Sequence, residues 1–142
     1  MKDIILRIIG KSLVGETEEQ QMEFVTEGKF YKKGNAFYIV YDESELSGMP
    51  GCKTSLKLNE NSIRMKRYGN AISHDTIMEF ERGKRYEGYY ETPFGHFEME
   101  LLTNSINNTV SNEGTGTIDI DYHISLKGLS EGRSRLNIEI LS

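Results

Sequence analysis

The sequence is short of cysteine, of long apolar runs and of basic charge. Cys52 is the single cysteine in 142 residues, which excludes a disulfide framework and a cysteine-based zinc site and suits a reducing compartment. Arg7 interrupts the apolar run Ile4–Leu6 near the start of the chain, so we expect neither a signal peptide nor a membrane-spanning segment there. These features predict a cytoplasmic protein with no membrane partner.

Basic residues are outnumbered by acidic ones, 17 to 22, and the formal net charge is −5. Binding along a nucleic-acid backbone requires a basic surface, so we do not expect nucleic acid as a partner. The stretch RMKRYG at 64–69 combines basic and aromatic side chains, as single-stranded nucleic-acid platforms do. Its apolar and basic residues alternate, however, as they do in an ordinary strand with a basic outer face.

No window carries an apolar stripe at helical spacing, and period-two alternation recurs along the chain instead. In TIDIDYHISLK at 117–127, one face is apolar and the other is polar. The alternation predicts an all-β protein with little helix. The predicted strands are 2–13, 19–32, 36–43, 53–59, 62–68, 76–82, 85–91, 96–103, 115–127 and 133–141.

Short Gly/Asn turns separate most of these strands, as tight antiparallel hairpins require. We therefore predict one domain, 1–142, formed by an up-and-down meander of about 8–10 strands that closes into a barrel and so removes its exposed edges; a two-sheet sandwich is the alternative. TPFG at 92–95 is interpreted as a hairpin turn. The longer connections are expected to be a loop over the barrel mouth at 43–52 and a polar surface loop at 104–114.

Short sequence patterns along most of the chain resemble those of a known family. They are TEGKFY at 26–31, YDE at 41–43, RYG at 67–69, FERG at 80–83, YYETPFG at 89–95 and IDIDYHISLKG at 118–128. In these the chain resembles the YwiB-like family of small uncharacterised bacterial proteins. The resemblance implies a calycin-like (lipocalin-like) β-barrel and a cytoplasmic bacterial protein, and it implies no particular activity.

Motifs for catalysis and for cofactor binding are absent from the sequence. It has no G-x-S-x-G, no phosphate-binding glycine loop and no dinucleotide fingerprint. His74, His96 and His123 share no metal-ligand spacing, and the paired acids, such as Asp119 and Asp121, are expected on solvated strand faces. An enzyme is therefore the least favoured class, and we expect no cofactor and no metal.

Arg67 is the residue that the alternation does not explain. It continues the inward series of Ile63 and Met65, so a guanidinium should face the apolar side of the sheet. The side chain either anchors an anionic ligand or is stabilised without one, by reaching the rim or by pairing with an internal carboxylate or tyrosine. The other candidate ligand-binding residues predicted to face inward are Tyr41, Tyr86, Tyr90, Tyr122, Thr26 and Thr54.

Two classes of function fit these predictions. The first is a non-enzymatic barrel that binds a small, partly apolar molecule with an anionic group. The second is a structural or protein-interaction module whose barrel interior is filled by side chains. An interior cavity above about 300 Å³ would favour the first class. A homodimer is compatible with either.

Overall fold

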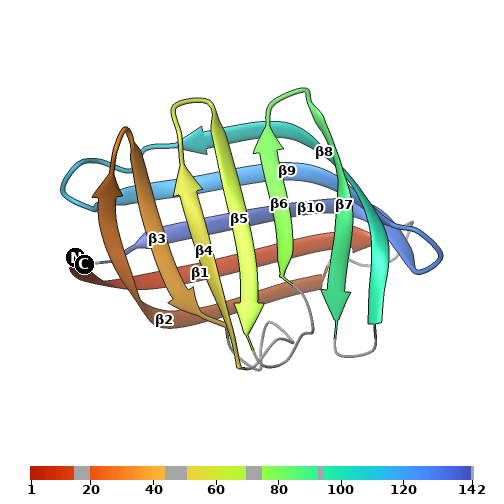
Figure 1. The fold of residues 1–142 in the computed structure, drawn as a ribbon, viewed down its shortest axis with the longest axis horizontal. Helices are drawn as coiled ribbons and strands as arrows, with labels where there is room; N and C mark the ends of the chain where they lie inside the picture. Colours follow the sequence, from red (N-terminus) through yellow and green to blue (C-terminus); the bar gives the residue numbers. More distant parts are fainter. Residues whose placement is uncertain (15–19, 44–50, 70–74, 93–94, 142) are drawn as a thin grey trace.

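Ten antiparallel strands form the computed structural model, which describes residues 1–14, 20–43, 51–69, 75–92 and 95–141. Their bounds are β1 (Lys2–Val14), β2 (Gln20–Lys33), β3 (Ala36–Asp42), β4 (Cys52–Leu58), β5 (Ser62–Gly69), β6 (Thr76–Glu81), β7 (Arg85–Thr92), β8 (Gly95–Asn108), β9 (Gly116–Leu126) and β10 (Ser130–Ile140). The sheet order is β6-β5-β4-β3-β2-β1-β10-β9-β8-β7. Each strand pairs with its neighbour in that order, and Figure 1 shows the sheet curled into a barrel with both termini at one end.

The barrel is nearly closed: β6 and β7 are the two edges of the sheet, and no backbone ladder joins them among the described residues. At one end of the seam the hydroxyl of Thr76 accepts a hydrogen bond from the main-chain N–H of Glu91, at 2.9 Å. At the other end the main-chain N–H of Gly83, in the β6–β7 turn, donates to the carbonyl of Thr103 on β8, also at 2.9 Å. The first bond joins the two edge strands directly, and the second joins the β6–β7 turn to β8, so the predicted barrel comes close to closure at this seam.

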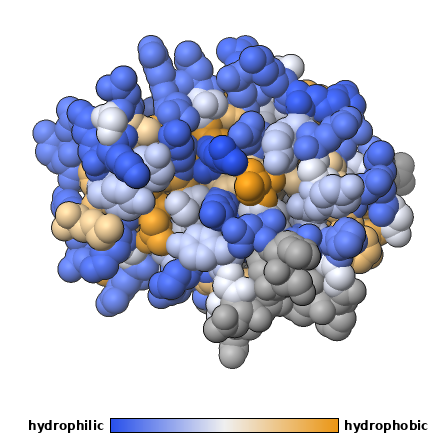
Figure 2. Space-filling model, viewed as in Figure 1, coloured by the Kyte–Doolittle hydropathy of each residue, from blue (hydrophilic) through white to orange (hydrophobic). Residues whose placement is uncertain are grey.

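Alternation along each strand produces the core, because successive side chains point to opposite faces of a sheet. The inward set is large and aliphatic or aromatic, and its most completely buried members are Leu6, Ile39, Leu56, Phe80, Leu101, Ile118 and Ile138. The outer surface in Figure 2 is largely hydrophilic, with separated apolar patches between polar side chains. The part of the chain that the structure describes has no helix long and apolar enough to cross a membrane.

The predicted strands match the observed ones closely, with one clear exception at 104–114. That stretch was predicted to be a loop, yet β8 continues through Asn108, with a register irregularity between Thr103 and Ser105. Ile106 packs against the core, and β9 pairs with the extension from Ser105 to Asn108, so pairing overrides the low strand propensity of asparagine. The remaining residues form a bonded turn in which the N–H of Ser111 donates to the carbonyl of Thr115, at 2.9 Å.

Three other expectations concern loops. Cys52 was expected in a loop, but it is buried at the start of β4, where its carbonyl accepts a hydrogen bond from the N–H of Glu43. The hairpin at 92–95 is bounded by a paired Thr92 and Gly95, whereas its two central residues lie outside the described residues. Of the loop expected over the barrel mouth at 43–52, residues 44–50 also lie outside them, as does His74.

Candidate ligand-binding site

A pocket of about 540 Å³ lies at the barrel end where β1 finishes and β2 begins. Eight strands contribute to its lining, and the contribution of β4 is indirect, through Thr54 beneath it. The apolar part of the lining consists of Ile8, Met22, Met65, Met78, Ile124, Leu126 and Leu136. Gly10 also lines the pocket, and a Cβ atom there would lie 3.2 Å from the end of the Met22 side chain. The end of Met22 therefore occupies the space that a side chain at position 10 would take and forms part of the pocket wall there.

One row of inward side chains across three strands carries the polar part of the site. Tyr41 of β3 pairs with Thr54 of β4, which pairs with Arg67 of β5. Directly opposed residues on one face of an antiparallel sheet lie close enough for their side chains to interact. Three residues predicted separately from alternation are therefore direct cross-strand neighbours.

Glu43, just after β3, joins this row and carries a buried carboxylate. Its side chain is 3% exposed, and that of Arg67 is 14% exposed. The hydroxyl of Thr54 donates a hydrogen bond of 2.5 Å to Oε1 of Glu43. Nη2 of Arg67 lies 3.6 Å from the same oxygen, an ion-pair distance that is longer than a good hydrogen bond. The two charges neutralise each other without using all of their hydrogen-bonding capacity.

Tyr90 on β7 is the second partner of Arg67. Nη1 of Arg67 donates a hydrogen bond to the Tyr90 hydroxyl at 3.0 Å, and the guanidinium carbon lies 6.0 Å from the centre of the tyrosine ring. Nε of Arg67 is buried and has no hydrogen-bond partner among the described residues. Buried polar groups of native proteins are nearly always bonded, so this donor marks unfilled capacity in the site.

Burial and charge set the ionisation of the site. Burial raises the pKa of Tyr41, and the nearby carboxylate of Glu43 raises it further, so the phenol stays neutral. Burial raises the pKa of Tyr122 to about 12, with a smaller contribution from Tyr90. Burial alone would lower the pKa of Arg67, but the adjacent Tyr90 and Glu43 outweigh it and raise the pKa above its ordinary value. The pocket therefore contains the charged guanidinium of Arg67 and the carboxyl group of Glu43, with the phenols of Tyr41 and Tyr122 held neutral beside them.

Four of the seven predicted site residues line this pocket: Tyr41, Arg67, Tyr90 and Tyr122. The other three do not. Thr54 is fully buried and bonded to Glu43, and the Thr26 hydroxyl lies 3.3 Å from the carbonyl of Asp42, to which it donates. Tyr86 borders surface grooves near the β6–β7 seam instead.

Sequence reasoning missed Glu43, the buried partner of Arg67. The signal was present, because Glu43 stands two residues after the inward Tyr41, and period-two alternation puts both on one face. An acid at a strand end is ordinarily exposed to solvent, so alternation alone does not distinguish Glu43 from a surface carboxylate.

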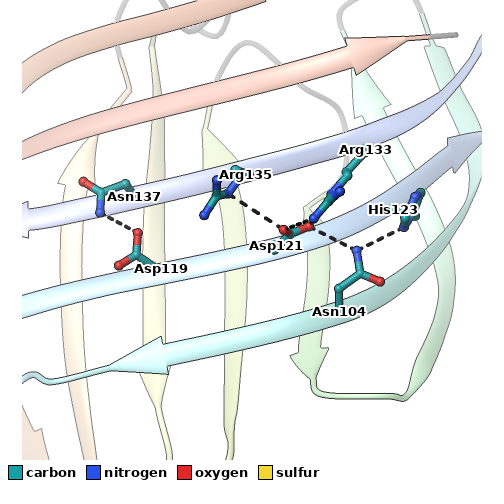
Figure 3. Close-up of polar contacts among 7 residues, drawn as sticks. All are labelled: Asn104, Asp119, Asp121, His123, Arg133, Arg135 and Asn137. Carbon is teal, nitrogen blue, oxygen red and sulfur yellow. Dashed lines mark hydrogen bonds and ion pairs between the residues drawn. The ribbon is translucent and has the colours of Figure 1, made fainter. Parts of the chain in front are cut away.

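A second polar cluster lies outside the barrel, on the outer faces of β8, β9 and β10 (Figure 3). Asp121 accepts hydrogen bonds from Nε and Nη2 of Arg133, at 2.9 and 2.6 Å, and from Asn104 at 3.1 Å. The bonded Arg133 lowers the pKa of Asp121 to about 2. Asp121 was predicted to be solvated, yet it is only 8% exposed, because the cross-strand side chains of Arg133 and Arg135 cover it.

The rest of this outer cluster is also internally bonded. Asn137 donates to Asp119 at 2.7 Å, and the amide nitrogen of Asn104 lies 3.1 Å from Nδ1 of His123. The exposed His123 is thus placed on the outer face, as its register predicts, and His96 is exposed as well. Because each carboxylate of the cluster has partners from the same sheet, we interpret the cluster as a cross-strand brace.

The fold and the pocket define the class of small up-and-down β-barrels with an interior pocket at one end. Residues 7–138 match the family model described as a domain of unknown function, DUF1934, and the chain belongs to that family. The chain is 29% identical over 116 residues to the uncharacterized beta-barrel protein YwiB of Bacillus subtilis (strain 168), covering 80% of this chain and 78% of that protein. The resemblance to the YwiB-like family is thereby confirmed.

A solved structure supports the same fold. The crystal structure of the ywiB protein from Bacillus subtilis aligns with a TM-score of 0.75, covering 99% of this chain and 94% of that one, at 24% sequence identity. The prediction of an antiparallel β-barrel is confirmed by this likeness and by the strand order.

Proposed function

We propose that this protein is a non-enzymatic barrel that binds a small, partly apolar molecule carrying an anionic group. The observation that carries the proposal is a pocket of about 540 Å³ with Arg67 in its wall. Small-molecule sites commonly occupy about 300–1,000 Å³ and combine apolar walls with a few polar groups. The proposal involves no reaction and no cofactor, and it includes a cytoplasmic location, which suits the single, buried, free Cys52.

The position of Arg67 favours recognition of an anion. Its side chain is largely shielded from solvent, and an electrostatic attraction is stronger in such a place than in water. Its planar guanidinium carries five N–H donors, and only the one on Nη1 that bonds Tyr90 lies at hydrogen-bond distance from a described residue. A carboxylate or phosphate oxygen reaching the pocket side of this group would use a donor that the described residues leave free.

Native mass spectrometry of protein purified from its own cells tests this proposal. We expect a bound molecule of small mass, retained by the wild type and lost in Arg67→Met. Arg64→Met is the matched control, because Arg64 lies on the same strand but faces outward with a side chain that is 52% exposed. The control should keep the bound molecule.

Loss of the molecule could also result from unfolding, because Arg67→Met leaves the buried Glu43 without its cation. The double variant Glu43→Gln/Arg67→Met removes both charges and should restore the fold while still lacking the bound molecule. Absence of any bound molecule from the wild type would overturn the proposal. So would retention of the molecule by a folded double variant.

The second candidate is an interaction module with a filled interior. This candidate is supported by the rest of the barrel interior, because a continuous core of buried side chains occupies the barrel outside the pocket end. Truncating inward side chains near the pocket, as in Met78→Ala, would then lower stability without changing any bound mass.

A further inference from the structure

The pocket contains buried charges of both signs. Arg67 and Glu43 both line it, and the distance of 3.6 Å between Nη2 and Oε1 leaves them paired electrostatically but not hydrogen-bonded to each other. Among the described residues, Glu43 accepts a short hydrogen bond from Thr54 and has the Tyr41 hydroxyl beside it, although an ionised carboxylate can accept about four bonds. Both groups thus have bonding capacity that a ligand could use.

A purely anionic ligand is a poor match for this arrangement. Its negative group would approach Arg67 and, with it, the carboxylate of Glu43, whose charge repels the ligand over a similar distance. Displacing Glu43 would leave a side chain that is 3% exposed without its cation, which is strongly unfavourable. A ligand that brings its own positive group for Glu43 avoids both penalties.

We propose, building on the function proposed above, that the ligand is a zwitterion of the amino-acid type: a carboxylate bound by Arg67, an adjacent ammonium bound by Glu43, and an apolar side chain. In an α-amino acid the two charged groups are attached to one carbon, so they suit two protein charges that lie side by side. The hydroxyls of Tyr41 and Tyr90, beside Glu43 and Arg67 respectively, would add an acceptor and a donor.

The remaining walls fit an apolar side chain. Met65 and Met78 lie on β5 and β6, and Ile124 and Leu126 on β9. Methionine side chains are flexible and polarisable, so they adapt to different apolar shapes. We therefore expect selection for the charged end of the ligand and tolerance at its apolar end.

Two matched sets of compounds test this inference by calorimetry or ligand-observed NMR. The first set is phenylalanine, 3-phenylpropanoate, which lacks the ammonium, and 2-phenylethylamine, which lacks the carboxylate. The second is leucine, 4-methylpentanoate and 3-methylbutylamine. We expect each amino acid to bind about 10- to 100-fold more tightly than either relative, the loss corresponding to one hydrogen bond to a charged group.

Variants sharpen the result. Glu43→Gln keeps an oxygen that can accept the Thr54 hydrogen bond but removes the negative charge, so its preference should reverse toward 3-phenylpropanoate. Arg67→Met, assayed in the Glu43→Gln background to protect the fold, should bind neither phenylalanine nor 3-phenylpropanoate. Arg64→Met should behave like the wild type.

The outcomes separate the zwitterion inference from the broader proposal. Tighter or equal binding of 3-phenylpropanoate by the wild type, lost with Arg67, would overturn the zwitterion inference and leave an anion-binding barrel. If none of the six compounds binds, the molecule seen by native mass spectrometry decides: one with both an ammonium and a carboxylate supports the inference, and one without an ammonium overturns it. No bound molecule at all would overturn both.

Discussion

The pair formed by Glu43 and Arg67 gives the sharpest prediction about stability. Three variants form a double-mutant cycle: Arg67→Met, Glu43→Gln and the two together. We expect Arg67→Met to lower the free energy of unfolding by about 3–5 kcal/mol, because it leaves a buried carboxylate unpaired. Glu43→Gln should have a smaller effect, because Arg67 is the more exposed partner and keeps its bond to Tyr90. The double variant should be more stable than Arg67→Met alone.

The separation and burial of the pair set the size of the coupling. At the observed 3.6 Å, two unit charges interact by about 1 kcal/mol in water and by about 5 kcal/mol at an effective dielectric constant of 20. Both side chains are mostly shielded, so the coupling free energy should lie well above the value for water. We predict about 2–4 kcal/mol, a range measured for neighbouring charged residues that interact strongly.

An exposed pair in the same barrel is a close control. Nε of Arg64 lies 3.7 Å from Oε1 of Glu79, almost the distance of the buried pair, but these side chains are 52% and 50% exposed. The same cycle with Arg64→Met and Glu79→Gln should give at most about 1 kcal/mol, as exposed ion pairs do. Because the two ion pairs have nearly the same separation, a difference between their coupling free energies reports the effect of burial.

Chemical denaturation followed by far-UV circular dichroism measures all of these free energies; the chain has no tryptophan, and its eight tyrosines provide a second, fluorescent probe. A coupling at Glu43 and Arg67 no larger than at the exposed pair would refute the claim that this pair acts in a shielded pocket. It would also remove the physical basis for charge recognition there.

Three further predictions concern pH and packing. The hydrogen-bonded Arg133 lowers the pKa of Asp121 from 3.8 to about 2 in the folded state. The stability that the Asp121 carboxylate contributes is therefore present above about pH 4 and is lost as the pH falls through about 2. Thermal denaturation should show that Asp121→Asn is less stable than the wild type above about pH 4 and that this difference disappears by about pH 2. Burial raises the pKa of Tyr122 to about 12, so the folded state holds a proton that the unfolded state loses near 10, and stability should fall as pH rises above about 10, less steeply in Tyr122→Phe; an equally steep fall in the variant would contradict this. Gly28→Ala should cost about 1–3 kcal/mol, since its Cβ would lie 2.8 Å from the Val40 carbonyl, whereas Gly10→Ala meets only a flexible methionine end and should cost less; equal melting temperatures for the two variants would refute the packing argument.

The fold was largely predictable because local pattern and global architecture agree. Period-two alternation marks each strand, and short turns join consecutive strands, so an antiparallel meander follows with few alternatives. The extension of β8 to Asn108 was not predictable from its own residues. Its asparagines favour loops, and only the length of β9 beside it makes a strand there stable.

The site was predictable only in part. Alternation placed Arg67 and Tyr90 inward, but their strands, β5 and β7, are not neighbours in the sheet order, and their contact depends on how the barrel closes. The stagger of the strands also decides which inward residues reach the pocket end. Tyr86 and Tyr90 share one face of β7, yet only Tyr90 lines the pocket. The alternation within a strand determines which face of the sheet a side chain occupies. The stagger of the strands in the closed barrel determines how far along the barrel axis that side chain lies.

The position of the Glu43–Arg67 pair in the barrel favours a role in ligand recognition over a purely structural one. A well-packed apolar replacement of a buried ion pair is often neutral or stabilising, so stability alone is a weak reason for Glu43 and Arg67 to be there. Elsewhere in the interior a hydrophobic cluster of buried side chains packs together, and the ring centres of Phe30 and Phe37 lie 5.6 Å apart. At the pocket end, side chains from eight strands line a space of about 540 Å³ that they do not fill. Because the buried charges coincide with the unfilled part of the barrel, recognition of a charged molecule explains both features with one cause, whereas a purely structural role explains neither.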